Sequence, residues 1–293
     1  MSGIDTFMLP ARDGFSLGAT LYTAEQPVGK LIVAAATGVP QGFYRRFAEY
    51  AREHGYTTLT FDYRGIGRSA PPTLRGFEME YLDWAYLDLA AAVDHMAGDG
   101  LPLYMVGHSF GGHAFGLLDN HAAVSGFYTF GTGAGWHGWM PRREQLKVLA
   151  MWRVIAPVLV RQKGCLAWSR LGMGEDLPVG VYRQWKRWCS FPRYFFEDPE
   201  MAGVERSFAE VRTPIVAVNA LDDLWAPPAS RDAFMSAYSQ APYQPVTLDS
   251  RARGLGPIGH MGYFRQSARP LWDEVLEWFA ALGTAAPEVS GAA

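Results

Sequence analysis

The chain has 293 residues, and 49% of them are hydrophobic, enough for a sizeable core in one large domain or two small ones. Its formal net charge is −3 and no Lys/Arg-rich run is present, which argues against a nucleic-acid-binding protein. Two cysteines, Cys165 and Cys189, suit a reducing compartment, and we find neither a signal peptide nor an apolar run of membrane-spanning length; we therefore expect a cytoplasmic protein.

Apolar runs alternate with amphipathic helical segments along the chain. The runs that predict strands are 15–22 (an exposed early strand), 30–36, 57–62, 103–106, 124–130, 214–219 and 245–248. The segments that predict helices are 43–54, 77–96, 110–120 and 269–282. This rhythm predicts an α/β fold with a mostly parallel central sheet and helices on both faces. In such sheets ligands bind beyond the C-terminal ends of the strands.

One segment, 136–198, interrupts the alternation because it shows no strand pattern. It is rich in tryptophan: Trp136, Trp139, Trp152, Trp168, Trp185 and Trp188. We predict an inserted helical cap at 136–198, a core made of 1–135 and 199–283, and a flexible tail at 284–293.

The apolar stretch 148–160 within this cap is open to two interpretations. It could be a helix that lies on a membrane surface, but a cap helix that packs on the core is favoured, with Pro157 kinking or ending it.

A serine at the end of the strand 103–106 carries the chemistry. The stretch Gly107-His-Ser-Phe-Gly111 has the G-x-S-x-G pattern between a buried strand and a helix, the setting of a nucleophile elbow. The turn is so tight that only glycine fits readily on either side of Ser109. The serine then needs an imidazole to accept its proton.

Among seven histidines, His260 is the best candidate for that base because it lies in a glycine-rich loop between the last strand and the last helix. His108 is expected to help wall the site, whereas His113 and His121 are expected to point elsewhere. Two acids, Asp222 and Asp223, follow the strand 214–219 and compete for the role of orienting the histidine.

The chain resembles the α/β-hydrolase superfamily along nearly its full length. Asp62-Tyr-Arg-Gly-Ile-Gly-Arg-Ser69 is similar to the D-x-R-G-x-G-x-S stretch of the branch that holds monoacylglycerol-lipase-like and serine-aminopeptidase-like proteins. Within that branch it resembles a set of bacterial predicted hydrolases. The sequence segments that carry this likeness are 36–46, 174–178, 184–189 and 259–265.

This resemblance implies an α/β-hydrolase fold and an acid that lies a few residues before a proline. Asp223, four residues before Pro227, fits that spacing better than Asp222. It also implies two backbone donors for a developing oxyanion, the N–H of Phe110 and the N–H of Val39. Thr37-Gly38 replaces the His-Gly of the relatives in the loop that carries Val39.

The predicted activity is that of a Ser-His-Asp hydrolase, with Ser109, His260 and Asp223 cleaving a carboxylic ester or thioester of a small or medium acyl substrate through an acyl-enzyme. Serine aminopeptidase or amidase activity, acyl transfer to an acceptor other than water, and a non-catalytic binding protein are the alternatives.

The pocket is the least determined part of the site. Substrate contacts are expected from His108, Trp136, Trp225 and Met261, and the cap tryptophans could either wall an apolar site or only fix the cap to the core. An aminopeptidase could use Glu175 or Asp176 to bind an amine, but we favour Asp176 as a helix N-cap. No metal site or cofactor is predicted, the partner is a small molecule, and the oligomeric state, a homodimer included, stays open.

Overall fold

The structure, a computed structural model, describes residues 3–285. Its centre is an eight-stranded sheet with the strand order β1-β2-β4-β3-β5-β6-β7-β8. The strands are β1 (Ile4–Pro10), β2 (Ser16–Tyr22), β3 (Gly29–Ala34), β4 (Tyr56–Phe61), β5 (Leu103–His108), β6 (Val124–Phe130), β7 (Ile215–Ala220) and β8 (Tyr243–Leu248). β1, β2 and β4 pair antiparallel, and all other pairs are parallel.

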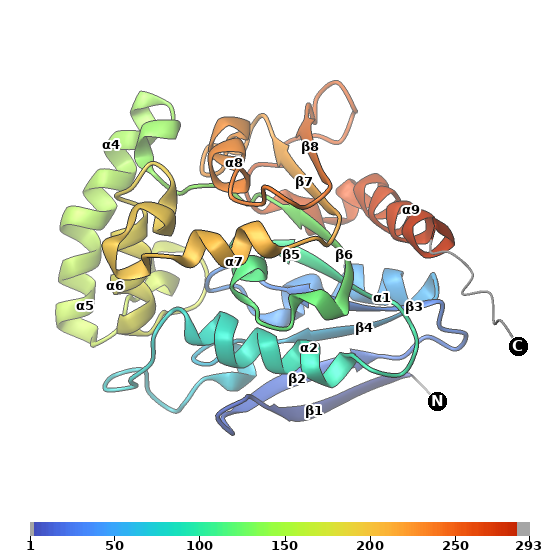
Figure 1. Cartoon of the computed structure of the whole chain (residues 1–293). Helices are drawn as coiled ribbons and strands as arrows, with labels where there is room; N and C mark the ends of the chain where they lie inside the picture. The colour runs from blue at the N-terminus through green and yellow to red at the C-terminus, as the bar shows by residue number, and fades with distance from the viewer. Residues whose placement is uncertain (1–2, 286–293) are drawn as a thin grey trace, which may run out of the picture.

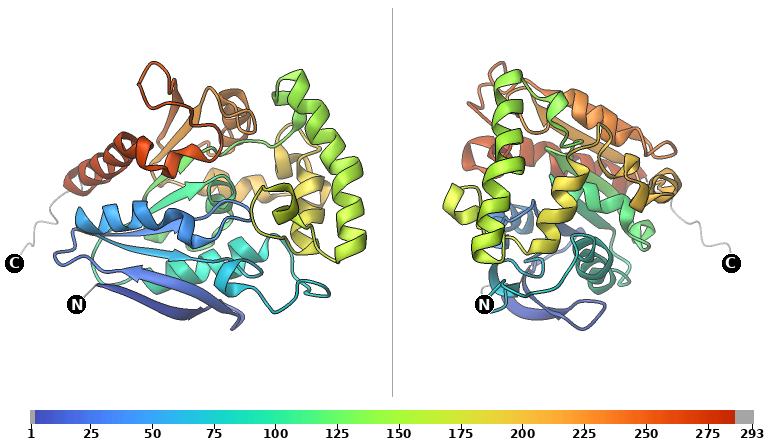
Figure 2. Two further views of the ribbon diagram at one scale, coloured as in Figure 1. Left: turned by 180° about the vertical axis from the view of Figure 1, so that it is seen from behind. Right: turned by 90° about the vertical axis from the view of Figure 1, so that its left-hand side faces the viewer.

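Helices cover both faces of this sheet. They are α1 (Arg45–Glu53), α2 (Ala90–Met96), α3 (Phe110–Ala114), α4 (Arg142–Ala150), α5 (Ala156–Lys163), α6 (Val179–Trp188), α7 (Val204–Glu210), α8 (Pro228–Met235) and α9 (Arg269–Ala285). Figures 1 and 2 show α1 and α9 on one face and α2 and α7 on the other. The predicted fold class is confirmed. β3 and β5 are buried at every position because the helices cover both of their sides.

The N-terminal edge of the sheet differs from the prediction. Strand β1 was not predicted, and it pairs along the whole of β2. The prediction that 15–22 is an exposed strand is wrong, because β2 lies between β1 and β4, and its residues Leu17 and Ala19 are fully buried.

Two predicted helices are shorter in the structure. The helix predicted at 77–96 begins only with a π-helical turn, Trp84–Leu89, because side chains take the preceding backbone donors: Gln184 Oε1 accepts from the Tyr81 N–H. The helix predicted at 110–120 consists of α3 and one 3₁₀ turn. The Gly116 N–H is diverted to the Tyr238 hydroxyl at 3.0 Å, and glycine is itself a poor helix former.

Residues 136–198 form a helical segment at one end of the sheet, on the left in Figure 1. α4 and α5 are joined by a π-helical turn, Met151–Ile155, so the helix continues past Pro157 to Lys163 and does not end there. The π-helical turn lies directly before the proline, whose ring nitrogen carries no hydrogen for an intrahelical bond.

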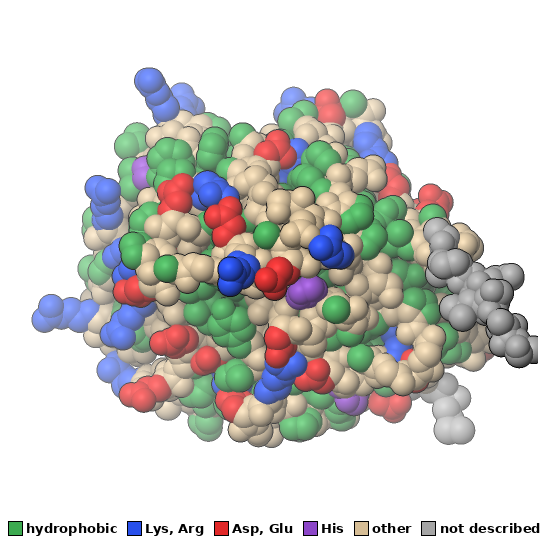
Figure 3. Space-filling model, in the orientation of Figure 1, with side chains coloured by type: hydrophobic (Ala, Val, Ile, Leu, Met, Phe, Trp, Pro, Cys, Tyr) green, Lys and Arg blue, Asp and Glu red, His purple; other side chains and the backbone are tan. Residues whose placement is uncertain are grey.

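Charges of both signs are mixed on the surface. Figure 3 shows Lys and Arg side chains interspersed with Asp and Glu over the visible face. Within residues 3–285, no helix is long and apolar enough to cross a membrane. Of the tail predicted at 284–293, Thr284 and Ala285 belong to α9, and 286–293 lie outside the described residues.

Candidate active site

The turn from β5 into α3 holds Ser109 in an unusual backbone conformation. Its φ is 51°, and Tyr194 is the other non-glycine residue with positive φ within the described part of the chain. Neighbouring backbone leaves no room for larger residues beside it: a Cβ at Gly111 would lie 2.1 Å from the Ala34 carbonyl oxygen. The strained, glycine-flanked turn therefore raises the serine at the C-terminal end of β5.

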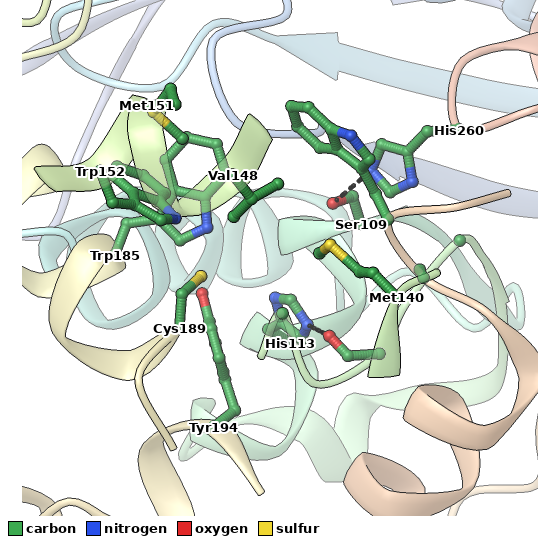
Figure 4. A pocket seen from close by; sticks show the side chains of 15 residues that line it. Ser109, His113, Met140, Val148, Met151, Trp152, Trp185, Cys189, Tyr194 and His260 are labelled. Atoms are coloured by element: carbon green, nitrogen blue, oxygen red, sulfur yellow. Dashed lines mark hydrogen bonds between the residues drawn. The ribbon is translucent and has the colours of Figure 1, made fainter. Parts of the chain in front are cut away.

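Three side chains from distant parts of the chain meet at this turn. The Ser109 hydroxyl lies 3.0 Å from Nε2 of His260, and Nδ1 of His260 lies 2.9 Å from Oδ2 of Asp223. Asp223 follows β7, and His260 lies in the loop after β8. Because a carboxylate only accepts, Nδ1–H donates to Asp223, which leaves the Nε2 lone pair free to accept the serine proton. Figure 4 shows the contact between Ser109 and His260.

The surroundings of Asp223 keep its charge. Burial by itself would raise its pKa, but the electrostatic and hydrogen-bonding interactions with His260, together with two backbone amides, hold the pKa below its usual value. Those amides, of Trp225 and Ala226, donate to Oδ1 at 3.0 and 2.9 Å. Asp222 plays a different part, because its Oδ2 accepts from the Ile258 N–H at 2.9 Å and so ties down the loop that carries His260.

The prediction that His108 walls the pocket is wrong. Its side chain is fully buried behind the site, where Nε2 lies 2.8 Å from the backbone carbonyl oxygen of His260 and Nδ1 lies 2.9 Å from the Tyr44 hydroxyl. Burial lowers its pKa to about 3, so the imidazole is neutral. His108 therefore supports the loop of His260 from below.

The two predicted oxyanion donors have different environments. The Phe110 N–H begins α3 and has no acceptor inside the helix. The Val39 N–H donates to the Ala36 carbonyl oxygen at 3.2 Å, closing a turn in which Gly38 has a φ of 71°. The structure thus gives the predicted second donor an internal acceptor.

A small pocket of about 50 Å³ opens beside Ser109 (Figure 4). It is lined by Ser109, His113, Gly131, Gly133, Gly135, Met140, Val148, Met151, Trp152, Trp185, Cys189, Tyr194, Trp225, Ala226 and His260. The lining is mostly apolar and contains no carboxylate. Of the four predicted substrate contacts, only Trp225 is among these residues.

The other predicted contacts lie elsewhere. The ring of Trp136 packs against those of His137 and Trp139, and Met261 packs against the hydrophobic core. His113, which was expected to point away, lines the pocket instead. It lies four residues after Ser109, and this i,i+4 spacing in a helix places both on one side, a signal that the sequence contained.

The tryptophans of the 136–198 segment divide between the two expected roles. Trp152 and Trp185 line the pocket and meet edge to face at 5.1 Å, whereas Trp168 and Trp188 are buried in the packing beneath. Some tryptophans of this segment therefore line the pocket, and others are part of the buried packing.

Glu175 and Asp176, the two acids proposed as amine ligands, accept hydrogen bonds from backbone N–H groups. Glu175 accepts from the Gly67 N–H at 2.6 Å. The prediction that Asp176 caps α6 is wrong, because Pro178 occupies the capping position of that helix. Asp176 instead accepts hydrogen bonds from the N–H and the hydroxyl of Ser169. Neither carboxylate lines the pocket beside Ser109.

Both cysteines are free, and burial raises the pKa of the Cys189 thiol at the pocket wall. Among residues 3–285, no cluster of three or more His, Cys, Asp or Glu side chains is arranged to hold a metal ion.

Comparisons with known proteins show what this chain is similar to. Residues 25–163 match the model of the family described as serine aminopeptidase, S33. A search of curated protein sequences finds no significant match. Among solved structures, the chain resembles a soluble variant of monoglyceride lipase from Saccharomyces cerevisiae, with a TM-score of 0.64, 16% identity and coverage of 95% of this chain and 96% of that one.

Two further structures have the same architecture. The Pyrococcus furiosus esterase PF2001 gives a TM-score of 0.63 at 13% identity, covering 95% of this chain and 90% of that one. A haloalkane dehalogenase loop variant from Bradyrhizobium elkanii gives a TM-score of 0.64 at 12% identity, covering 96% of this chain and 98% of that one. Identities this low show a common fold, and these proteins are named for different reactions. The chain therefore has the α/β-hydrolase fold, and residues 25–163 are similar to the family described as serine aminopeptidase, S33.

Proposed function

We propose that the protein is a serine hydrolase that cleaves carboxylic esters or thioesters with a short acyl chain. The observation that carries this proposal is the hydrogen-bonded series Ser109–His260–Asp223, with contacts of 3.0 and 2.9 Å, beside an apolar pocket. A hydroxyl in contact with a neutral imidazole, which is itself oriented by a buried carboxylate, is the arrangement that activates a serine for acyl transfer.

The proposed reaction has two halves. Ser109 Oγ attacks the acyl carbonyl carbon while Nε2 of His260 takes the hydroxyl proton, and Asp223 stabilises the imidazolium that forms. His260 then gives this proton to the departing alcohol or thiol. A water molecule repeats the attack on the acyl-enzyme, returns its proton through His260 and releases the acid.

The oxyanion of each tetrahedral intermediate needs donors fixed in advance. We assign the first to the Phe110 N–H. We assign the second to the Val39 N–H, which would share its hydrogen with the Ala36 carbonyl or release it as substrate binds.

The pocket supports the choice of short acyl groups. Its volume of about 50 Å³, measured as the space open to a water-sized sphere, compares with about 10–15 Å³ needed on that measure to hold one water molecule, so there is room for only a short chain. The residues from the 136–198 segment, including Trp152 and Trp185, would act as the cap over this space, with 3–135 and 199–283 as the core.

Aminopeptidase activity is the second candidate, because the family match is described by that name. An amine-binding pocket would be expected to offer an unpaired carboxylate. Here the pocket lining has none, and Glu175 and Asp176 are both bound to backbone donors.

A substrate panel separates the two candidates. We expect hydrolysis of acetyl to butyryl esters or thioesters, with rates that fall as the acyl chain lengthens, and little release from aminoacyl amides. Turnover confined to aminoacyl amides would overturn the ranking. Product that appears only when an added alcohol or amine acceptor is present would indicate an acyltransferase on the same triad.

A further inference from the structure

The lining of the apolar pocket beside Ser109 includes unpartnered polar atoms that the proposed reaction does not use. His113 is 6% exposed, and its Nδ1 is buried with no hydrogen-bond partner among the described residues. Buried polar atoms in proteins almost always have a partner, so an orphan on a side chain that lines a binding pocket points to a ligand.

The contacts of His113 fix what this atom can do. Nε2 lies 2.9 Å from the Gly133 carbonyl oxygen, which can only accept, so Nε2 carries the hydrogen. The ring is held between Tyr194 and Phe234, with centroid distances of 4.6 and 4.7 Å. Nδ1 of the neutral imidazole therefore offers a lone pair in a fixed direction, and burial, which lowers the pKa of His113 to about 4, keeps it unprotonated.

A second unpartnered polar atom belongs to Tyr194, whose ring packs against that of His113. The Tyr194 side chain is fully buried and lines the same pocket, and its hydroxyl, near that of Tyr81, makes no hydrogen bond of ordinary geometry with the described residues. Figure 4 shows the Tyr194 and His113 side chains among those that line the pocket. A phenol both donates and accepts.

We propose that His113, assisted by Tyr194, makes the pocket selective for a substrate whose bound arm carries a hydroxyl group. A hydroxyl donates to the Nδ1 lone pair and also accepts from a phenol, whereas an alkyl chain leaves both polar atoms unpaired. This inference rests on the proposed esterase function and names the substrate class within it. A site that hydrogen-bonds a substrate group discriminates strongly against an analogue that lacks the group.

Three esters test the inference, and one of them, propyl butyrate, is the reference compound. Propyl butyrate has no free hydroxyl, propyl 3-hydroxybutyrate has one in the acyl arm, and 3-hydroxypropyl butyrate has one in the alcohol arm. We expect the wild-type kcat/KM for one hydroxylated ester to exceed that for propyl butyrate at least tenfold, about the effect of one hydrogen bond. The preferred compound identifies the arm that occupies the pocket.

Two matched variants assign the preference to Nδ1. In His113→Gln, the longer amide can still donate to Gly133, but no acceptor remains at the position of Nδ1. In His113→Asn, an amide oxygen takes roughly the position of Nδ1, and the Gly133 contact is lost. The ratio of kcat/KM between the two esters is compared within each variant, so that a general loss of activity cancels.

We expect the ratio to fall to about one in His113→Gln and to stay high in His113→Asn. A wild-type ratio near one, or a ratio that both variants change equally, would overturn the inference and leave the proposed esterase function standing. If the wild type hydrolyses none of the three esters or their thioester analogues, the proposed function fails, and this inference fails with it.

Discussion

The Nε2–H of His108 donates a 2.8 Å hydrogen bond to the main-chain carbonyl oxygen of His260, so the residue before the candidate nucleophile holds the candidate base in place. This hydrogen bond is one of a longer series. Nδ1 of His108 must accept, and it does so from the Tyr44 hydroxyl, whose oxygen in turn accepts from the Ala36 N–H at 2.8 Å. One buried series of bonds thus connects the His260 loop to the loop that carries Val39.

Replacing His108 tests this positioning role. In His108→Leu the His260 carbonyl loses its donor, and we expect kcat to fall by about ten- to a hundredfold while KM changes little. His108→Gln can donate from its amide and should recover most of the loss. Steady-state kinetics of both variants provide the measurement, and equal losses of kcat in the two would show that the hydrogen bond does not matter.

The neighbouring acids form a second pair for comparison. Asp223→Asn leaves His260 without a carboxylate and permits the wrong tautomer, so we expect kcat to fall by about three to four orders of magnitude. Asp222→Asn keeps an oxygen that can accept from the Ile258 N–H, and kcat should stay within about tenfold of wild type. Active-site titration before each assay corrects for misfolded protein. The opposite order of effects would identify Asp222 as the functional acid.

The tight turn should tolerate no side chain at Gly111. A Cβ there would lie 2.1 Å from the Ala34 carbonyl oxygen, which is backbone and cannot move cheaply, so Gly111→Ala should cost about 3 kcal/mol or more of unfolding free energy. Gly42 is the matched control, because a Cβ at Gly42 meets nothing within 4 Å. Urea unfolding of the two variants should separate them clearly, and similar midpoints would show that the turn is looser than described.

The buried imidazole of His113 should make the fold sensitive to acid. Its pKa is about 4 in the folded protein and about 6.5 when unfolded, so between these values the unfolded chain binds more protons and stability falls as the pH falls. From pH 7 to pH 4 this amounts to about 3 kcal/mol at most.

His113→Gln removes this titration, while every other group titrates in both proteins and cancels in the difference. The loss of unfolding free energy between pH 7 and pH 4 should therefore be smaller in the variant than in the wild type. Equal losses in the two proteins would mean that the pKa of His113 is the same in the folded and the unfolded chain.

The strands of the sheet and the polar residues that follow them could be predicted from the sequence. The directions in which side chains point could not. The apolar runs of β5, β6 and β7 are visible because strands covered on both faces must be apolar throughout. Ser109 directly follows one such strand and Asp223 lies three residues after another, so their approach at one edge could be predicted. The direction of His108 could not, because the sharp turn at Ser109 separates adjacent side chains, and neither could the positions of Trp136 and Met261, which lie in irregular segments where tertiary packing decides.

Hydrogen bonds between distant segments also escape a sequence pattern. The Gln184 contact that replaces the first turns of the helix predicted at 77–96 joins residues about a hundred positions apart. Glu175 is held by the Gly67 N–H over a similar separation. Only the folded chain shows that these polar groups are already paired with backbone donors.

The central claim is that Ser109 is a nucleophile activated by His260, and covalent labelling tests it most directly. The protein is treated with a fluorophosphonate and the modified peptide is identified by mass spectrometry, with Ser109→Ala, His260→Gln and the exposed control Ser190→Ala in parallel. We predict one adduct, on Ser109, in the wild type and in Ser190→Ala, much slower labelling in His260→Gln and none in Ser109→Ala. Absence of labelling in the wild type, or full labelling of Ser109→Ala, would contradict the claim.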